Sequence, residues 1–192
     1  MYKIVVLAST NGTDLQAIID EMKAGKMSGI SLEAVISNKE NCGAMQKAKD
    51  FGTQAIHIPQ DDYEQNLLNK LQEINPDLIV MIGYMKILSP EITKAFHKKI
   101  INVHPALIPK YSGKNFYGKS VHEAVLEAKE TESGMTIHYV DEGVDTGEII
   151  LQKTCTIDDD ETPESLKEKV QALEKKYYPQ VIREFAAAHI DL

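Results

Sequence analysis

The 192-residue sequence lacks the features that mark several broad classes of protein. It has only two cysteines, Cys42 and Cys155, far apart and outside any CxxC pair, which indicates neither a disulfide framework nor a zinc ribbon. Its 21 Lys and Arg are outnumbered by 29 Asp and Glu, so binding of nucleic acid is not expected. No apolar run approaches the roughly 18 residues of a membrane span, and no small-residue cleavage site follows residues 1–8. We therefore expect a cytoplasmic protein that binds neither nucleic acid nor a membrane.

What the sequence does have is the composition of a globular protein, with 43% hydrophobic and 26% charged residues. The scaling of surface with mass allows about 70% of the surface of the extended chain to be buried, which supports a core without disulfide or metal. No internal repeat or low-complexity linker divides the sequence. We expect a single domain over residues 1–192.

The first half of the sequence alternates apolar runs with helical patterns. Short strands separated by helices of roughly ten residues are typical of βαβ units, which build a doubly wound sheet. The uninterrupted Leu-Ile-Val-Met-Ile run before Gly83 predicts a strand that is buried on both faces. The expected strands are residues 2–8, 32–36, 54–58 and 78–83, and the expected helices are residues 42–51, residues 63–74 and one that begins at Leu15.

The second half is less regular and predicts a different ending to the sheet. We expect a strand at residues 100–104, a loop at 105–118, a helix at 121–129, and strands at 134–141 and 148–157 that pair antiparallel. A final long helix begins after Thr162, a plausible N-cap followed by Pro163, and Pro179 is expected to kink it. The predicted fold class is α/β, with a Rossmann-like, mostly parallel sheet, an antiparallel C-terminal strand pair and a final long helix.

Residues 113–120 match the phosphate-loop pattern G-x-x-x-x-G-K-S. Such a loop follows a strand directly, but Pro105 and Pro109 exclude a central strand in the preceding segment. We therefore favour an active-site loop punctuated by glycines, and a nucleotide hydrolase remains a distant alternative.

No metal site is predicted. His122-Glu123 resembles the start of a zinc-protease motif, but Leu126 stands where the second histidine belongs. The remaining histidines outside residue 104 stand singly, and we expect surface or hydrogen-bonded structural roles for His57, His97, His138 and His189.

Asn102-Val-His104-Pro105 is a stronger candidate for chemistry. Asn102 and His104 lie two apart on a predicted strand, so their side chains leave by the same face, at the carboxyl end where open α/β sheets place their ligand sites. An amide and an imidazole can both bind the oxyanion of an acyl-transfer intermediate, and a protonated histidine can return a proton. A strand end whose polar side chains only bond to loop backbone is the alternative.

Two further segments support an active site. Asp145 lies in a glycine-containing loop between strands, where a carboxylate could reach His104 and favour its imidazolium form. Residues 9–14 link the first strand to the first helix, where free backbone N–H groups and the helix dipole attract phosphate. Simple capping of that helix by Asp14 is the alternative.

These segments, together with Met85-Lys-Ile-Leu-Ser-Pro90 and the Phe116 to Val125 region, resemble in order and spacing the glycinamide ribonucleotide formyltransferases. The similarity runs from about Lys3 to Phe185. Asn-x-His-Pro and Asp-Thr-Gly resemble segments of all 10-formyltetrahydrofolate-dependent formyltransferases, so they indicate the chemistry more than the amine substrate.

The resemblance implies transfer of a formyl group from 10-formyltetrahydrofolate to the amine of glycinamide ribonucleotide in purine synthesis, without a metal. The partners would be these small molecules, and the protein a monomer or a homodimer. The phosphate-binding half would span about residues 1–100, and the catalytic and folate-binding half about 101–192.

The resemblance also implies roles for particular residues. Asn102 and His104 would hold the oxyanion, while Asp145 would keep His104 charged and assist proton movement. The substrate would be held by Gly12, Thr13, Asp14, Gln171 and Glu174. The folate pocket would be lined by Met85, Lys86, Ile87, Leu88 and Asn102 and by Asp141, Glu142, Gly143, Val144 and Asp145. The Ile108–Pro109 peptide bond is expected to be cis, with Tyr111 to Tyr117 forming a lid.

Two positions depart from the family pattern. Thr13-Asp14 replaces the usual Ser-Asn, and an Asp beside a phosphate adds Coulomb repulsion, on the order of 1 kcal/mol at 4 Å in water. Gln60 occupies the position of an arginine that often reaches the folate tail. A related enzyme that formylates another amine or releases formate, and a folate-binding protein without turnover, are the alternatives. The deformylase usually has a regulatory domain before the catalytic one, for which residues 1–8 leave no space.

Overall fold

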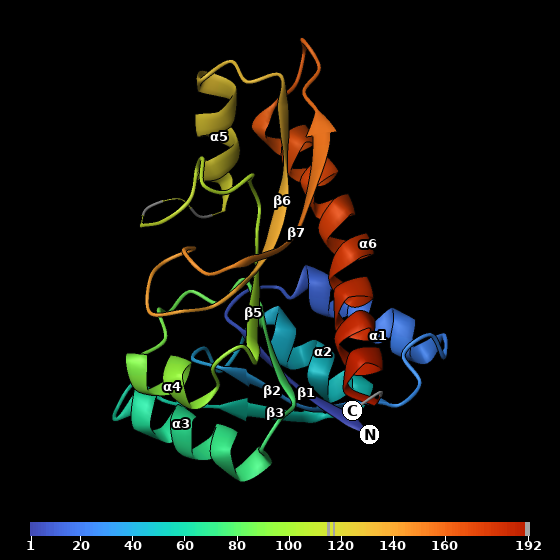
Figure 1. Cartoon of the computed structure of the whole chain (residues 1–192), viewed down its shortest axis with the longest axis vertical. Coiled ribbons are helices and arrows are strands. Elements are labelled where there is room, and N and C mark those ends of the chain that lie inside the picture. The colour runs from blue at the N-terminus through green and yellow to red at the C-terminus, as the bar shows by residue number, and fades with distance from the viewer. Residues whose placement is uncertain (115, 117, 191–192) are drawn as a thin grey trace.

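The computed structural model describes residues 1–114, 116 and 118–190, and its seven strands form one sheet in the order β3-β2-β1-β4-β5-β6-β7 (Figure 1). Strands β1 to β5 run parallel, while β6 is antiparallel to both β5 and β7. The predicted fold class is therefore confirmed. The strands are β1 (Tyr2–Ala8), β2 (Ile30–Ser37), β3 (Gln54–His57), β4 (Leu78–Ile82), β5 (Ile100–His104), β6 (Glu132–Tyr139) and β7 (Ile149–Thr156). The helices are α1 (Thr13–Lys23), α2 (Gly43–Phe51), α3 (Tyr63–Ile74), α4 (Pro90–Ala95), α5 (Lys119–Glu127) and α6 (Pro163–Ile190).

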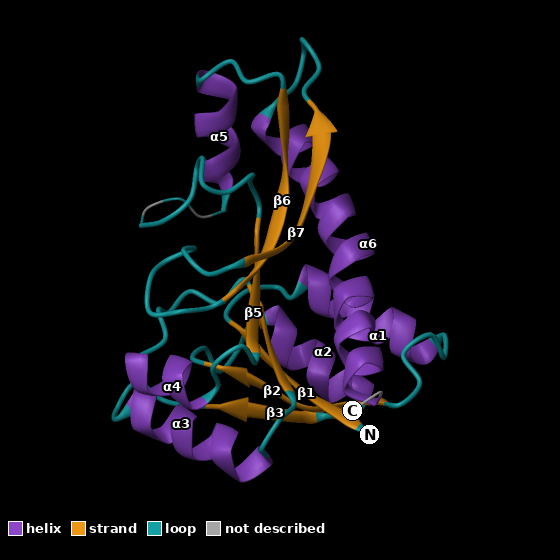
Figure 2. Cartoon of the chain, in the orientation of Figure 1, coloured by secondary structure: helices purple, strands orange, loops and turns teal. Residues whose placement is uncertain are grey.

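Helices cover both faces of the sheet (Figure 2). Successive side chains of a strand point to opposite faces, so Ile4 and Val6 of β1 pack into one core with α1, α2 and α6, while Val5 and Leu7 pack into the other with α3 and α4. This double burial explains why β1 and β4 are apolar at nearly every position.

The strand order reverses between β1 and β4, and the loops that follow these strands are tied together. The amide of Met85 donates to the hydroxyl of Ser9 at 3.1 Å, and that hydroxyl donates to Asn38 Oδ1 at 2.6 Å. Gly83 has a φ of +53°, and a Cβ there would lie 2.4 Å from Thr10 Oγ1, so only glycine allows this approach. The carboxyl edge of the sheet is thereby opened at its switch point, where α/β proteins bind ligands.

Helix α6 crosses the sheet and carries side chains to the same edge. Its N-cap is Thr162 as predicted, because the Ser165 amide donates to Thr162 Oγ1 at 3.1 Å, and the helix continues through Pro179 to Ile190. The buried Tyr178 hydroxyl lies 2.9 Å from the Met81 carbonyl and 3.1 Å from the Ile101 carbonyl, which fixes α6 against β4 and β5.

One helix was not predicted from the sequence. Ser89 accepts a hydrogen bond from the Ile92 amide, with Pro90 in the first helical position, so the six-residue α4 has an ordinary N-terminal signature. Its shortness hides the apolar periodicity that predicts longer helices. In the described part of the chain, no helix combines the length and apolarity needed to cross a membrane.

Candidate active site

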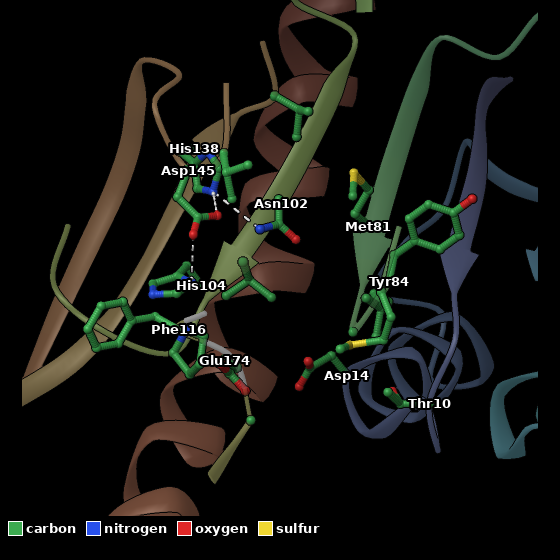
Figure 3. A pocket seen from close by; sticks show the side chains of 18 of the residues that line it. Thr10, Asp14, Met81, Tyr84, Asn102, His104, Phe116, His138, Asp145 and Glu174 are labelled. Atoms are coloured by element: carbon green, nitrogen blue, oxygen red, sulfur yellow. Dashed lines mark hydrogen bonds and ion pairs between the residues drawn. The ribbon is translucent and has the colours of Figure 1, made fainter. Parts of the chain in front are cut away.

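A cavity of about 640 Å³ lies at the carboxyl ends of β1, β4 and β5. It is bordered by the loops after β5 and β6 and by α6 (Figure 3). Most residues predicted to act in catalysis or binding line this single cavity: Thr13, Asp14, Met85, Lys86, Ile87, Leu88, Asn102, His104, Asp141, Gly143, Val144, Asp145, Gln171 and Glu174.

Asn102, His104 and Asp145 are brought together as predicted, with a second histidine beside them (Figure 3). Asp145 Oδ2 lies 3.4 Å from His104 Nδ1, and Asp145 Oδ1 lies 3.5 Å from His138 Nε2. Asn102 Nδ2 lies 3.2 Å from the same His138 nitrogen. One carboxylate thus bridges two buried imidazoles, and the amide of Asn102 is held at the cavity surface.

The hydrogen bonds of His138 determine how Asn102 is presented. His138 Nδ1 lies 2.8 Å from the Tyr139 carbonyl, which can only accept, so this nitrogen carries the proton in the neutral ring. Its Nε2 then accepts one N–H of Asn102. Within the part of the chain that the structure describes, the second N–H of that amide has no hydrogen-bond partner, so it is open to a ligand oxygen.

His104 faces hydrogen-bond acceptors with both ring nitrogens. Its Nε2 donates to the Tyr111 carbonyl at 2.7 Å, and its Nδ1 faces Asp145. Burial lowers the pKa of His104 below its usual value, and the opposing effects of Asp145 and the Tyr111 carbonyl only partly offset it. Desolvation therefore outweighs the carboxylate in this structure, and the role of Asp145 in keeping His104 charged during the reaction stays a prediction.

Asp145 itself stays ionised. Burial would raise its pKa, but the interactions with His138 and His104 and the hydrogen bond that the Gly113 amide donates to Oδ2 at 2.9 Å together hold the pKa below its usual value. The residue adopts a left-handed backbone conformation with a φ of +57°. Non-glycine residues in this conformation are uncommon and gather at functional sites.

The expected hydrogen-bonded structural role of His138 is confirmed, but its partner Asn102 was not predicted. It pairs directly opposite Asn102 across the antiparallel β5–β6 ladder. The sequence predicted pairing of β6 with β7 but not with β5, so it did not place these two side chains together. The period-two spacing of Thr136 and His138 on the same strand face is the signal that was available.

The predicted folate-lining residues form an apolar end of the cavity. Met85 and Ile87 are 48% and 62% exposed, unusual for large apolar side chains, and Leu88 is buried beneath them. Lys86 lies over the ring of Tyr63, 4.2 Å from its centroid, and the Tyr63 and Tyr84 hydroxyls are hydrogen-bonded under the loop. Glu142 is not among the cavity-lining residues, since its carboxylate pairs with Lys94 at 3.3 Å.

The predicted phosphate end is built by the first turn of α1. Gly12, not Asp14, is the N-cap, with a φ of +66° and no side-chain capping bond, so the capping alternative for Asp14 is wrong. Gly12 does not itself line the cavity, whereas Thr13 and Asp14 do. Gln171 and Glu174 approach the same end from α6.

The G-x-x-x-x-G-K-S string does not form a phosphate loop. The segment before it is a loop with the predicted cis bond between Ile108 and Pro109, and Asn115 and Tyr117 of the string lie outside the described residues. Lys119 Nζ pairs with Glu164 at 2.6 Å and with Glu123 at 3.5 Å on the surface, away from the cavity lining. Gly113 contributes to the active site instead, because its backbone amide donates a hydrogen bond to Asp145.

His122 also lines the cavity, a place that the sequence analysis did not predict for it. It is buried, and its Nδ1 has no hydrogen-bond partner within the described part of the chain. Burial, helped by the positive charges of Lys167 and His104, lowers the pKa of His122 to about 4. The ring is therefore neutral and offers an unsatisfied nitrogen next to the cavity.

Comparison with known proteins agrees with this geometry. The family model described as formyl transferase matches residues 2–182. The phosphoribosylglycinamide formyltransferase of Haemophilus influenzae is 37% identical over 198 residues, which cover 100% of this chain and 91% of that protein. The structure of a phosphoribosylglycinamide formyltransferase from Coxiella burnetii, in complex with CHES, has 38% identity and a TM-score of 0.90, covering 97% of this chain and 88% of that one.

The plant relatives are longer than this chain. The chloroplastic phosphoribosylglycinamide formyltransferase of Arabidopsis thaliana is 34% identical over 187 residues, and the match spans 94% of this chain but 64% of the plant protein. The chain therefore belongs to the formyl transferase family.

Proposed function

We propose that the protein transfers the formyl group of 10-formyltetrahydrofolate to the amine of glycinamide ribonucleotide, a step of purine biosynthesis. The observation that carries the proposal is the contact of Asp145 with both His104 and His138, with Asn102 bonded to the same His138. This arrangement supplies an amide donor, an imidazole and a carboxylate at one point of a cavity, as acyl transfer requires.

The reaction replaces one bond from the formyl carbon to nitrogen by another. The substrate amine attacks the formyl carbon, and the carbonyl oxygen becomes an oxyanion that the free N–H of Asn102 is placed to bind. Collapse of this intermediate breaks the bond to the folate nitrogen, and the proton lost by the amine ends on that nitrogen. Asp145, ionised and in contact with His104, is the group placed to relay it.

His104 stabilises the oxyanion by becoming charged. Burial lowers its pKa, but a negative oxygen forming beside the ring favours the imidazolium, whose two N–H groups match the acceptors already facing them. For His104 to donate directly to the oxyanion, its Nε2 must leave the Tyr111 carbonyl. The loop that carries Tyr111 would therefore yield as the substrates enter.

The folate end of the cavity fits an aromatic ligand with a charged tail. Met85, Ile87 and Val144 offer apolar surface, and Lys86 is a cation on the same loop. The sequence has one arginine, Arg183, and it pairs with Glu21, so the role of the family's arginine at position 60 falls to a lysine. We assign the folate tail to Lys86.

The other end fits a phosphorylated ribose. The first amides of α1 have no acceptor within the helix, and the cavity there is lined by Thr13, Gln171 and Lys167. Within one domain, the half spanning about residues 1–100 would thus bind the phosphate, and the half spanning about residues 101–192 would bind the formyl donor and carry the reacting groups.

A product assay tests this function. Purified protein is incubated with 10-formyltetrahydrofolate and glycinamide ribonucleotide, and formylated product and formate are quantified by mass spectrometry. Formylated product equal to the folate consumed is expected. If formate is the main product, the protein is a deformylase and the proposal is wrong. If the protein hydrolyses ATP and Lys119→Ala abolishes that activity, the protein is a nucleotide hydrolase.

A further inference from the structure

Two buried carboxyl groups line the phosphate end of the cavity. Asp14, in the first turn of α1, is 7% exposed, and Glu174, on α6, is 6% exposed. Both line the cavity, and Figure 3 shows their carboxyl groups pointing into the same part of it. Asp14 Oδ1 has no hydrogen-bond partner among the described residues, which is rare for a buried carboxylate oxygen.

The surroundings do not neutralise this pair. The charge of Lys175 acts on both carboxyls and that of Lys167 acts on Glu174, but among the described residues no ion pair joins either lysine to them. The neighbouring Tyr178 hydroxyl is already committed to the carbonyls of Met81 and Ile101. Two desolvated carboxylates that repel each other do not both ionise, so the pair retains a proton to a higher pH than either carboxyl would alone.

The titration of each group agrees with this geometry. Burial raises the pKa of Asp14 to about 6, although Lys175 opposes the rise. Burial, together with the charge of Asp14, raises the pKa of Glu174 well above its usual value, against the opposing effects of Lys175 and Lys167. The free amides at the start of α1 act the other way, since a helix N-terminus favours a nearby anion.

A phosphate arriving at these amides adds negative charge beside Asp14. A charged Asp14 would repel it, whereas a protonated Asp14 has an O–H that can donate to a phosphate or ribose oxygen. The unpartnered Asp14 oxygen is therefore open to a hydrogen bond with a ligand. That ligand must be able to accept or donate a hydrogen bond beside a carboxyl group.

We propose that Asp14 and Glu174 act as one proton-sharing carboxyl pair that holds the phosphoribosyl part of the substrate, and that binding retains or takes up one proton. The inference rests on the proposed function for the identity of the substrate. It makes Asp14 a specificity-determining residue. Affinity for a phosphorylated ribose then falls as pH rises, by up to about tenfold per pH unit between the pKa values of the free and the occupied pair.

Calorimetry of glycinamide ribonucleotide binding tests the proposal. Titrations at pH 6, 7 and 8, each in two buffers with different heats of ionisation, give both affinity and protons exchanged. The comparison is between the wild type, Asp14→Asn and the control Asp20→Asn, which removes one charge from the exposed face of the same helix. The substrate's own phosphate, whose second pKa is near 6, contributes equally to all three proteins.

At pH 7, wild type and Asp20→Asn should each take up about half a proton or more on binding the nucleotide in excess of the number that Asp14→Asn takes up. From pH 6 to pH 8, the dissociation constants of these two proteins should rise by a factor about tenfold or more larger than the factor for Asp14→Asn. At pH 8, Asp14→Asn should bind the nucleotide more tightly than either of them. Equal proton uptake in all three proteins overturns the pair.

A carbon-13 NMR titration of the wild-type carboxyl groups decides the matter without any variant. One carboxyl of the pair should titrate at or above pH 6 in the free protein and at higher pH with the nucleotide bound. If both titrate below pH 5 in either state, the proposal fails. If the protein binds the nucleotide with proton uptake but does not transfer a formyl group, the proposed function is wrong and the proposal for the carboxyl pair still holds.

Discussion

At the scale of single residues, the site depends on which hydrogen-bond roles are already taken. His138 occupies one N–H of Asn102, and Tyr111 and Asp145 occupy both nitrogens of His104. The Asp145 carboxylate therefore orients the rings of His104 and His138. Among the described residues of this cluster, the Asn102 amide is the group with an N–H still available to a ligand. This distribution gives Asn102 and His104 separate effects on the reaction.

Replacing Asn102 or His104 by alanine should lower kcat by about 100-fold or more, the usual cost of an oxyanion donor or a proton-transfer group. Both side chains lie at a cavity edge, so chemical denaturation should show little change in stability for Asn102→Ala. Steady-state formyl-transfer kinetics provide the measurement. Near wild-type turnover in both variants would contradict the catalytic assignment.

Replacing Asp145 by asparagine should lower the pKa of His104 further. The carboxylate raises that pKa against the effect of burial, and its removal leaves desolvation unopposed by a charge. NMR titration of the His104 ring should give a midpoint below 6.5 in the wild type and lower still in Asp145→Asn. An unchanged or raised midpoint in the variant would show that Asp145 does not act on His104 through its charge.

At the scale of elements, the phosphate end depends on how α1 begins. Gly12 holds a left-handed conformation, and a Cβ there would lie 2.9 Å from the Cβ of Ala44 on α2. The Ala44 amide in turn donates to the Thr10 carbonyl at 3.1 Å. The loop after β1 is thus held between the sheet and α2, which fixes where the first amides of α1 point.

Gly12→Ala should destabilise the fold by about 2 kcal/mol or more, because left-handed strain and a collision with Ala44 add. It should also raise KM for the nucleotide, since α1 must shift. Gly25→Ala is the matched control: Gly25 has a φ of +73° with nothing within 4 Å of the added Cβ. Urea unfolding and kinetics of both variants test this, and an equal KM effect at the two positions would refute it.

Sequence patterns predicted the elements that follow a regular period. Strands β1 and β4 were clear because both faces are buried, and α6 was clear because Thr162 and Pro163 mark its start. The pairing of β5 with β6 joins segments about thirty residues apart with no short turn between them, so the contact of Asn102 with His138 was not predictable. The resemblance assigned Asp14 and Glu174 to one substrate site, but the burial of both carboxyl groups was not predictable, because it depends on how α6 crosses the sheet.

At the scale of the whole molecule, buried titratable groups make stability depend on pH in opposite ways. His122, with a folded pKa of about 4, contributes stability above pH 6.5 that is lost as the pH falls toward 4. Asp14, with a folded pKa of about 6, contributes stability below its unfolded value that is lost as the pH rises toward 6. These two effects run over nearly the same pH interval with opposite signs, so together they leave stability nearly constant between about pH 4 and pH 6.

Asp14→Asn should stabilise the protein at pH 8 by up to about 3 kcal/mol, the equivalent of two pKa units, and by much less at pH 4.5. The amide has nearly the same shape and carries no charge to desolvate. Urea unfolding at the two pH values provides the comparison. A stability gain that is the same at both would assign the effect to packing and not to ionisation.

The central claim is that one cavity holds a formyl donor against Asn102, His104 and Asp145, and a phosphorylated amine against the start of α1. A crystal structure with glycinamide ribonucleotide and a non-transferable folate analogue tests it most directly. The account predicts the phosphate at the amides of residues 12–14 and the substrate amine within hydrogen-bonding distance of the Asn102, His104 and Asp145 cluster. A phosphate seated on residues 113–120, or a folate ring away from residues 85–88, would contradict it.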